Sequence, residues 1–333
     1  MTLEPPSFRD VLEARVRIRP HLAPTPLRQF AVLNQLLGAE TWIKHDNLLP
    51  TGAFKVRGGI NLVSRLDADE RRRGVIAAST GNHGQSVAYA ARLFGVSAII
   101  CAPLDANPVK VAGMEELGAE VIRQGADYDE ARLNCEHLAR DQGYRYIHSG
   151  DEPLLIAGVG TNTLEILEER PEIDTLIVPI GGGSGAAGAA IVAKAINPRI
   201  RVVGVQSAQS PAAYESWRAG RLVKAPNRTR AEGLSTGTAF ELPQRILKEH
   251  LDDFLLIDDG EIEAAIPLAI QATRTLVEAA AASTLAAALR LKDQLAGSRT
   301  ALISTGANIS PEQLVRAMSQ AAEAAPRFPS RQG

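Results

Sequence analysis

The chain has 333 residues, of which 36 are Lys or Arg and 38 are Asp or Glu, so its formal net charge is only -2. This length exceeds the size at which one hydrophobic core usually stops growing, so two domains are expected. The charges form no long run of one sign and aromatic residues make up only 4% of the chain, which argues against binding to nucleic acid or to a membrane surface. The expected partner is a small molecule.

No targeting, membrane or metal signal stands out along the chain. The start, MTLEPPSFRD, lacks a basic segment followed by an apolar one, and no apolar stretch approaches the roughly 20 residues that a transmembrane helix needs. A cytoplasmic protein is therefore expected. Cys101 and Cys135 have no second cysteine or histidine at metal-ligand spacing, which predicts structural roles for both.

The first half of the chain predicts a helix and then a parallel sheet. Ser7 and Asp10 have capping-box spacing and predict a short helix that stops by Pro20. From Gly74 onward, apolar runs at 74–79, 97–103, 119–124 and 144–148 alternate with helix-period segments at 82–94, 108–117 and 128–140. This repeated strand–helix alternation is typical of a parallel sheet covered on both faces.

The second half predicts another sheet of the same kind. A helix at 154–169, a strand at 175–180, a helix at 184–195 and a strand at 201–206 follow in order. Residues 208–241 are rich in Gly, Pro, Ser and Thr and are expected to form surface loops near the site. A strand at 253–257, two Ala-rich helices across 261–295 and a strand at 300–304 come next. A final helix is capped by Ser310, and the tail after Ala325 is expected to fray.

A glycine-rich segment, PIGGGSGAAG at 179–188, follows a predicted strand and precedes a predicted helix. Its N–H groups and the positive end of the helix form a site for an anion. Gly183, Gly185 and Gly188 match the dinucleotide pattern GxGxxG, but Gln206 stands where a nicotinamide site would need an acidic residue, which disfavours a dehydrogenase. The alternative is that these glycines only permit tight strand-to-helix packing.

Two further glycine segments carry candidate reactive and binding groups. Lys55 in PTGAFKVRGG lies between Phe54 and Val56, where an amine can be desolvated enough to act as a nucleophile, although an isolated lysine is usually a solvated surface residue. In ASTGNHGQS, Ser79 or Asn82 would cap the next helix, and the same N–H groups would bind a substrate carboxylate. His83 is expected to be a helix-start donor more than an acid or base.

Together these segments resemble the fold-type II family of pyridoxal-phosphate enzymes, in particular its threonine/serine dehydratase and serine racemase branch. The resemblance runs from TPL at Thr25 to STGAN at Ser304. It implies a tryptophan synthase β-like α/β fold of two domains, each with a mainly parallel sheet flanked by helices. The large domain would comprise residues 1–70 and 150–333, and the small domain residues 71–149.

By this resemblance, pyridoxal 5'-phosphate is the cofactor and Lys55 is the residue that binds it covalently. The resemblance also implies that the hydroxyl of Thr305 faces the pyridine nitrogen and that Asn82 lies near the phenolic oxygen. Phe54 and the phosphate loop complete the cofactor site, the loop being Gly181, Gly182, Gly183, Ser184 and Gly185. The substrate carboxylate would bind to Ser79, Thr80, Gly81, Asn82 and His83.

The activity implied is elimination of water from a 3-hydroxy L-amino acid, giving a 2-oxo acid and ammonia, by a homodimer. Lys55 would take the α-proton. The branch usually has Glu, Gln and Ser where this chain has Asp46, Leu49 and Ala53, which predicts a more apolar site and makes L-threo-3-phenylserine a rival to L-serine and L-threonine. The divalent-metal ligands of several relatives would fall at Gln206 and Ala212, so no metal is expected.

Several alternatives stay open. Thr80 stands where serine racemases carry their serine and is a second catalytic candidate, which leaves an amino-acid racemase possible on the same scaffold. A dehydratase of another 3-hydroxy amino acid, such as hydroxyaspartate, is a further possibility. A non-enzymic pyridoxal-phosphate carrier would not need the STGNHG segment.

Overall fold

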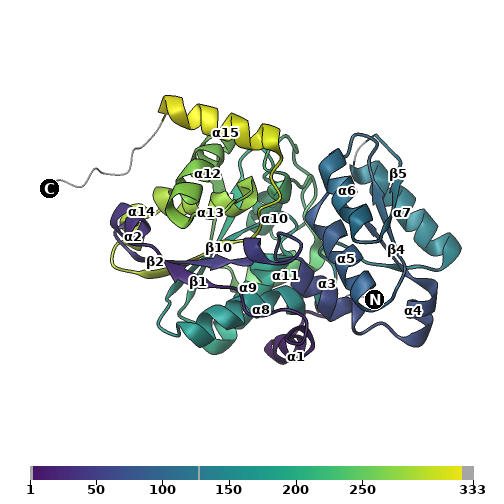
Figure 1. The fold of residues 1–333 in the computed structure, drawn as a ribbon. Coiled ribbons are helices and arrows are strands. Elements are labelled where there is room, and N and C mark those ends of the chain that lie inside the picture. Colours follow the sequence, from purple (N-terminus) through teal and green to yellow (C-terminus); the bar gives the residue numbers. More distant parts are fainter. Residues whose placement is uncertain (1–2, 127, 325–333) are drawn as a thin grey trace.

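The computed structural model describes residues 3–126 and 128–324, which form two sheets flanked by helices (Figure 1). The six-stranded sheet has the spatial order β1 (Leu27–Gln29), β2 (Glu40–His45), β10 (Arg299–Ser304), β7 (Thr175–Pro179), β8 (Arg201–Ser207), β9 (Asp253–Ile257). The four-stranded sheet has the order β5 (Glu120–Arg123), β4 (Ala98–Ala102), β3 (Val75–Ala78), β6 (Arg145–Tyr146). Every described pairing is parallel except that of β1 with β2.

The helices carry the labels of Figure 1 and have the following bounds. They are α1 (Phe8–Ile18), α2 (Ala31–Leu37), α3 (Val56–Val63), α4 (Ala68–Arg73), α5 (Asn82–Leu93), α6 (Pro108–Glu116), α7 (Tyr128–Gln142), α8 (Pro153–Glu169), α9 (Ser184–Ile196), α10 (Ala212–Ala219), α11 (Glu241–His250), α12 (Asp259–Thr273), α13 (Ala279–Arg290), α14 (Lys292–Leu295) and α15 (Pro311–Ala324). Two short 3-10 helices are η1 (Asp46–Leu48) and η2 (Glu232–Leu234). None of the helices among the described residues is long and apolar enough to cross a bilayer.

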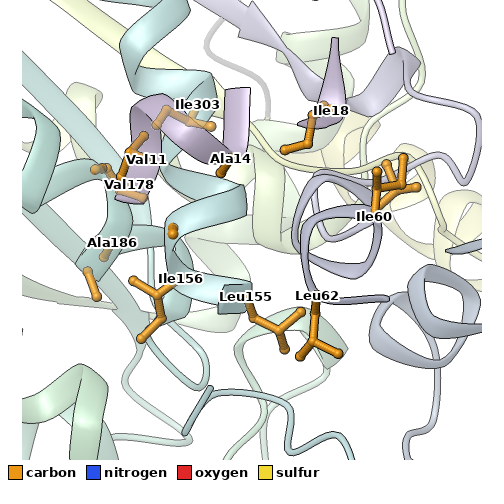
Figure 2. Packing of buried hydrophobic residues seen from close by; sticks show 14 of the residues in the cluster. Val11, Ala14, Ile18, Ile60, Leu62, Leu155, Ile156, Val178, Ala186 and Ile303 are labelled. Atoms are coloured by element: carbon orange, nitrogen blue, oxygen red, sulfur yellow. The ribbon is translucent and has the colours of Figure 1, made fainter. Parts of the chain in front are cut away.

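Both faces of the large sheet are buried, as its apolar strands predict. Val178 and Ile303 belong to one hydrophobic cluster, which includes residues of α1, α3, α8 and α9 (Figure 2), whereas their chain neighbours Ile177 and Leu302 belong to a second one with α12 and α13. Successive side chains of a strand point to opposite faces, so the two clusters are the two covers of one sheet. A Cβ on Gly188 would lie 2.8 Å from the Gly160 nitrogen, so that glycine serves the packing of α9 on α8.

The predicted elements from residue 74 onward are largely confirmed. The Ser7–Asp10 capping box precedes α1, and the predicted strands and helices of the first sheet are present. The prediction of loops across 208–241 is wrong in part, because Ala212–Ala219 forms α10, which ends where Gly220 takes the left-handed conformation. The Ala-rich region forms three helices, α12, α13 and α14, instead of two.

The strand order reverses once in each sheet. In the small sheet the chain passes from β3 to β4 and β5 and then returns to form β6 on the other side of β3. In the large sheet it passes from β7 to β8 and β9 and then returns to form β10 on the other side of β7. Ligands of open parallel sheets bind where the strand order reverses, at the carboxyl ends of the strands. The strands of the small sheet lie between Val75 and Tyr146, within the predicted small domain, whose limits stay a prediction. The tail after Ala325 lies outside the described residues.

Candidate active site

The segment that carries Lys55 is joined by backbone hydrogen bonds to the segment after β10. Ala53 and Gly306 form an antiparallel bridge, and the Phe54 N–H donates to the Thr305 carbonyl at 2.9 Å. The Ala307 N–H donates to the Gly52 carbonyl at 2.8 Å. These backbone bonds bring together two of the motifs that the sequence singled out, 250 positions apart as read from Lys55 and Thr305.

The Lys55 amine contacts the predicted phosphate loop. Its Nζ donates to the Ser184 Oγ at 2.8 Å and to the Ser149 carbonyl at 3.0 Å. The Phe54 ring centroid lies 5.5 Å from the same nitrogen. Burial lowers the pKa of the Lys55 ammonium group to about 8, so a useful fraction of the amine is neutral near physiological pH. Lys55 is therefore not an ordinary solvated lysine.

The glycine loop between β7 and α9 has no room for side chains. A Cβ on Gly181 would overlap the Gly233 carbonyl, and one on Gly182 would overlap the Phe240 ring. Gly183 has φ of +91°, which favours glycine, and it directly precedes α9. The loop thus exposes backbone N–H groups at the positive end of a long helix, the arrangement that binds phosphate.

The STGNHG segment begins α5 and leaves N–H groups available. The Ser79 Oγ accepts from the N–H groups of Gly81 at 3.1 Å and Gly84 at 2.9 Å, so Ser79 and not Asn82 holds the start of the helix. The N–H groups of Asn82 and His83, in the first turn, have no intrahelical acceptor. Thr80 is half-buried between them and β3. The geometry suits a carboxylate, as predicted for this loop.

His83 links the loop to the segment after β6. Its Nε2 lies 3.1 Å from the Ile147 carbonyl, and because a carbonyl only accepts, Nε2 carries the proton. Burial, together with the nearby Lys55 charge, lowers the pKa of His83 to about 3. The neutral ring is a poor acid at physiological pH, in line with a structural role.

Close helix packing brings Lys55 and the STGNHG segment together. A Cβ on Gly59, in α3, would lie 2.6 Å from the Ser86 carbonyl of α5, so only glycine permits this contact. The Ser86 Oγ also donates to the Lys55 carbonyl at 2.6 Å. Gly59 therefore permits the close packing of α3 on α5.

The residues present fit pyridoxal phosphate. Among the described residues, the buried Thr305 Oγ1 has no hydrogen-bond partner, and a buried hydroxyl without one is rare. A pyridine nitrogen would satisfy it as an acceptor. The Lys55 amine and the glycine-rich loop at Gly181–Gly185 would supply the other two attachment points that this cofactor needs.

Sequence reasoning missed Arg57, two residues after Lys55. Arg57 is fully buried and binds Asp46 at 2.8 Å and Glu165 at 2.6 Å, and Lys44 also pairs with Glu165. This ion network ties α3 to η1 and to α8. In the sequence, the network is signalled only by Arg57, the charged residue of the mainly apolar helix α3.

The expectation that Asp46, Leu49 and Ala53 make the site more apolar is not supported by their positions. Asp46 is bound by Arg57, Leu49 belongs to the hydrophobic core, and Ala53 is fully buried in the bridge to Gly306. Charged side chains lie near the carboxylate loop instead: Lys110 and Glu232 form an ion pair, and Glu278 binds Asn82.

Gln206 and Ala212, the positions at which several relatives would carry metal ligands, make other contacts in this structure. The Gln206 Oε1 accepts from the Tyr214 N–H at 3.0 Å, and Ala212 is buried at the start of α10. Across residues 3–126 and 128–324, no group of three or more His, Cys, Asp or Glu is arranged to hold a metal ion. Metal independence stays a prediction.

Comparison with known proteins agrees with this geometry. The family described as "Pyridoxal-phosphate dependent enzyme" matches residues 18–306. The L-threonine ammonia-lyase of Thermotoga maritima is 34% identical to this chain, over 93% of this chain and 77% of the relative. The L-threo-3-hydroxyaspartate ammonia-lyase of Saccharomyces cerevisiae is 35% identical, over 91% of this chain and 94% of the relative. The structure of serine racemase from Dictyostelium discoideum superposes with a TM-score of 0.86 at 34% identity, covering 92% of this chain and 99% of the other. The chain therefore belongs to the family of pyridoxal-phosphate-dependent enzymes and has the fold of its type II members.

Proposed function

We propose that the protein is an ammonia-lyase that eliminates water from a 3-hydroxy L-amino acid and yields a 2-oxo acid and ammonia. The observation that carries the proposal is the position of the Lys55 amine. The Lys55 Nζ donates to the Ser184 Oγ in the glycine loop. The backbone around Lys55 is hydrogen-bonded to the Thr305 carbonyl through the Phe54 N–H and to the Ser86 hydroxyl through the Lys55 carbonyl. Ammonia-lyases among the relatives support the same reaction class.

The chain's own groups account for binding and proton transfer. Pyridoxal phosphate, when bound, supplies the electron sink for the pair left on Cα. The free N–H groups of Asn82 and His83 hold the substrate carboxylate and fix the Cα–H bond relative to Lys55. The Lys55 amine would remove the α-proton, for which its lowered pKa suits it.

Thr305 favours elimination over other reactions of this cofactor. Its neutral hydroxyl would donate a hydrogen bond to the pyridine nitrogen but would bring no negative charge to stabilise a proton there. Pyridoxal phosphate held in this way would be a weaker electron sink, which would favour loss of the β-hydroxyl over reactions that store charge on the ring. Ser79 serves as the loop's internal cap in this scheme, and its hydroxyl is not free for the substrate.

The substrate is tested by following 2-oxo acid release from L-serine, L-threonine, L-threo-3-phenylserine and L-threo-3-hydroxyaspartate under identical conditions. We expect the highest kcat/KM for serine or threonine, because the charged groups beside the carboxylate loop disfavour a phenyl ring. Release from none of the four would overturn the lyase proposal. A preference for phenylserine would restore the apolar-site interpretation.

A second candidate substrate is hydroxyaspartate. Lys110 is almost fully buried, and its Nζ lies 3.5 Å from where a Cβ on Gly81 would stand, within the carboxylate loop. A second carboxylate on the substrate would meet this ammonium group, now paired with Glu232. Lys110→Met should then reduce kcat/KM for hydroxyaspartate while that for serine changes little.

We also propose that the protein acts as a homodimer. This follows from the family resemblance and is measured directly by sedimentation equilibrium of the holoenzyme. A mass near the 35.5 kDa of one chain at micromolar concentration would contradict it.

A further inference from the structure

The buried carboxylate of Glu278 holds the side chain of Asn82. Glu278 directly precedes α13 and is 7% exposed. The Asn82 Nδ2 donates to its two carboxylate oxygens at 2.9 and 3.2 Å, although 196 positions separate the residues. A Cβ on Gly306 would lie 2.8 Å from the Glu278 Cδ, so the loop after Thr305 has no side chain where this carboxylate sits.

Asn308 binds the oxygen of the Asn82 amide, whose nitrogen is bound by Glu278. Its Nδ2 donates to the Asn82 Oδ1 at 2.7 Å and to the Thr51 carbonyl at 2.9 Å, which uses both hydrogens of the amide. Because carboxylates and carbonyls only accept, the orientation of both amides is fixed. Asn82 must turn its nitrogen toward Glu278 and its oxygen toward Asn308. One hydrogen of the Asn82 Nδ2 satisfies Glu278, and the second is left to bind a ligand.

The groups that face Glu278 come from four segments. They are the Lys110 ammonium of α6, the Glu232 carboxylate of η2, the Asn82 amide of α5 and the backbone N–H of Asn308. Lys110 is already paired with Glu232, which also accepts from the Gln313 Nε2 at 2.7 Å. The hydrogen bonds to Glu278 therefore come from neutral groups, the Asn82 amide and the Asn308 N–H, while the Lys110 charge also favours its ionised form.

We propose that Glu278 is a positioning residue: it orients the Asn82 amide so that one N–H is presented to the ring oxygen of pyridoxal phosphate. The inference rests on the proposed function and on the family resemblance, which implies that Asn82 lies near that oxygen. Without the acceptor, the Asn82 amide can turn about its side chain and lose the hydrogen bond to the cofactor. Asn308 serves the same end by fixing the amide oxygen.

A double-mutant cycle tests the coupling, with the affinity for pyridoxal phosphate as the readout. The holoenzyme is stripped and titrated with the cofactor, and the dissociation constant and absorbance maximum are recorded for wild type, Glu278→Ala, Asn82→Ala and the double variant. We expect each single change to weaken binding roughly tenfold, the cost of one hydrogen bond to a charged group. The double variant should bind no more weakly than Asn82→Ala alone. Additive losses would overturn the proposal.

Two further variants separate positioning from structural damage. Glu278→Gln keeps an acceptor and should bind the cofactor within about threefold of wild type. Glu263→Gln removes another buried carboxylate, one whose partners are Arg230 and Arg316, and should leave the affinity unchanged. An equal loss in Glu263→Gln, or no recovery in Glu278→Gln, would show that only folding is affected and would overturn the inference.

Protein stability gives a readout that needs no cofactor. Burial raises the pKa of Glu278 to about 7, with the Lys110 charge opposing the shift, so the folded state binds this proton more tightly than the unfolded chain. The stabilisation is full below pH 4.5 and disappears as pH rises through about 7. Glu278→Gln should lack this pH dependence if the carboxylate is buried as described. If wild type retains the dependence but Asn82→Ala binds the cofactor normally, the premise about Asn82 fails, and with it this part of the proposed function.

Discussion

The Phe54 N–H donates to the Thr305 carbonyl at 2.9 Å, so the residue next to Lys55 is joined directly to the residue whose buried hydroxyl has no partner among the described residues. This hydrogen bond couples the backbone positions of the two segments. By the family resemblance, Lys55 would bind pyridoxal phosphate and Thr305 would face its pyridine nitrogen, so changes at Thr305 are expected to alter the electronic state of the cofactor.

Thr305→Asp should slow elimination by about tenfold or more, since ~1.4 kcal/mol on the barrier suffices for that factor. An aspartate favours a protonated, positively charged ring, which stores charge instead of expelling the β-hydroxyl. A species absorbing at longer wavelength should accumulate when substrate is added. Thr305→Ser retains the donor and should keep most activity. Wild-type turnover in the aspartate variant, with no new absorbance, would mean that Thr305 does not face the pyridine nitrogen.

Borohydride reduction of the holoenzyme, followed by peptide mapping, should label Lys55. The rate at which stripped protein regains the covalent bond should rise about tenfold per pH unit below pH 8 and level off above it, because only the neutral amine attacks. Stopped-flow absorbance measures this rate. A label on any other lysine would remove the central assignment.

Thr80→Ala should affect stereochemistry more than substrate binding. By the family resemblance, its hydroxyl meets the substrate on the face opposite Lys55, where a second proton donor would be needed for racemisation. Exchange of the α-proton and product chirality are followed in heavy water for both proteins. If neither forms D-isomer and exchange is unchanged, the racemase alternative and the catalytic role of Thr80 are both wrong.

Chelation should leave turnover essentially unchanged. The Gln206 Oε1 is already bound to the Tyr214 N–H, and Ala212 offers no side-chain ligand. Activity is measured after dialysis against EDTA and again after addition of magnesium or calcium. Loss on dialysis with recovery on metal addition would reveal a cation site elsewhere in the protein.

Arg57→Met should destabilise the protein by about 3–5 kcal/mol at pH 7, because it leaves buried carboxylates without their counter-ion. In the wild type, burial alone would raise the pKa of Asp46, but the Arg57 charge and hydrogen bonds outweigh it and lower that pKa. The resulting stabilisation of the folded protein is present above the ordinary pKa of Asp46 and is lost as pH falls through its pKa in the folded protein. The deficit of the variant should therefore shrink in acid. Urea unfolding at pH 7 and at a pH well below 3.8, the ordinary pKa of an aspartate, measures it, with the exposed Arg9→Met as the control. Equal, small losses in both variants would mean that the network contributes little.

The sequence alone was sufficient for features that depend on neighbouring residues. The capping box at Ser7 and Asp10, the strand–helix alternation from residue 74 and the glycine loop after β7 all appear where their patterns predicted them. Local hydrogen bonds and side-chain period leave regular traces in a sequence, so such features can be derived without a structure. The apolar neighbours of Lys55 predicted a desolvated amine, which the structure shows, whereas its bond to the cofactor is a prediction from the family resemblance.

The tertiary structure decided which distant groups meet. The Asn82 amide is fixed by Glu278 and Asn308, which lie 196 and 226 positions away, and Arg57 is neutralised by a residue 108 positions away. No pattern within one segment encodes these pairs, because each depends on how two sheets and α3, α5 and α8 pack against each other. The charged groups beside the carboxylate loop follow from that packing, because Lys110 and Glu278 come from other segments. Asp46, Leu49 and Ala53, on which the expectation of an apolar site rested, are buried.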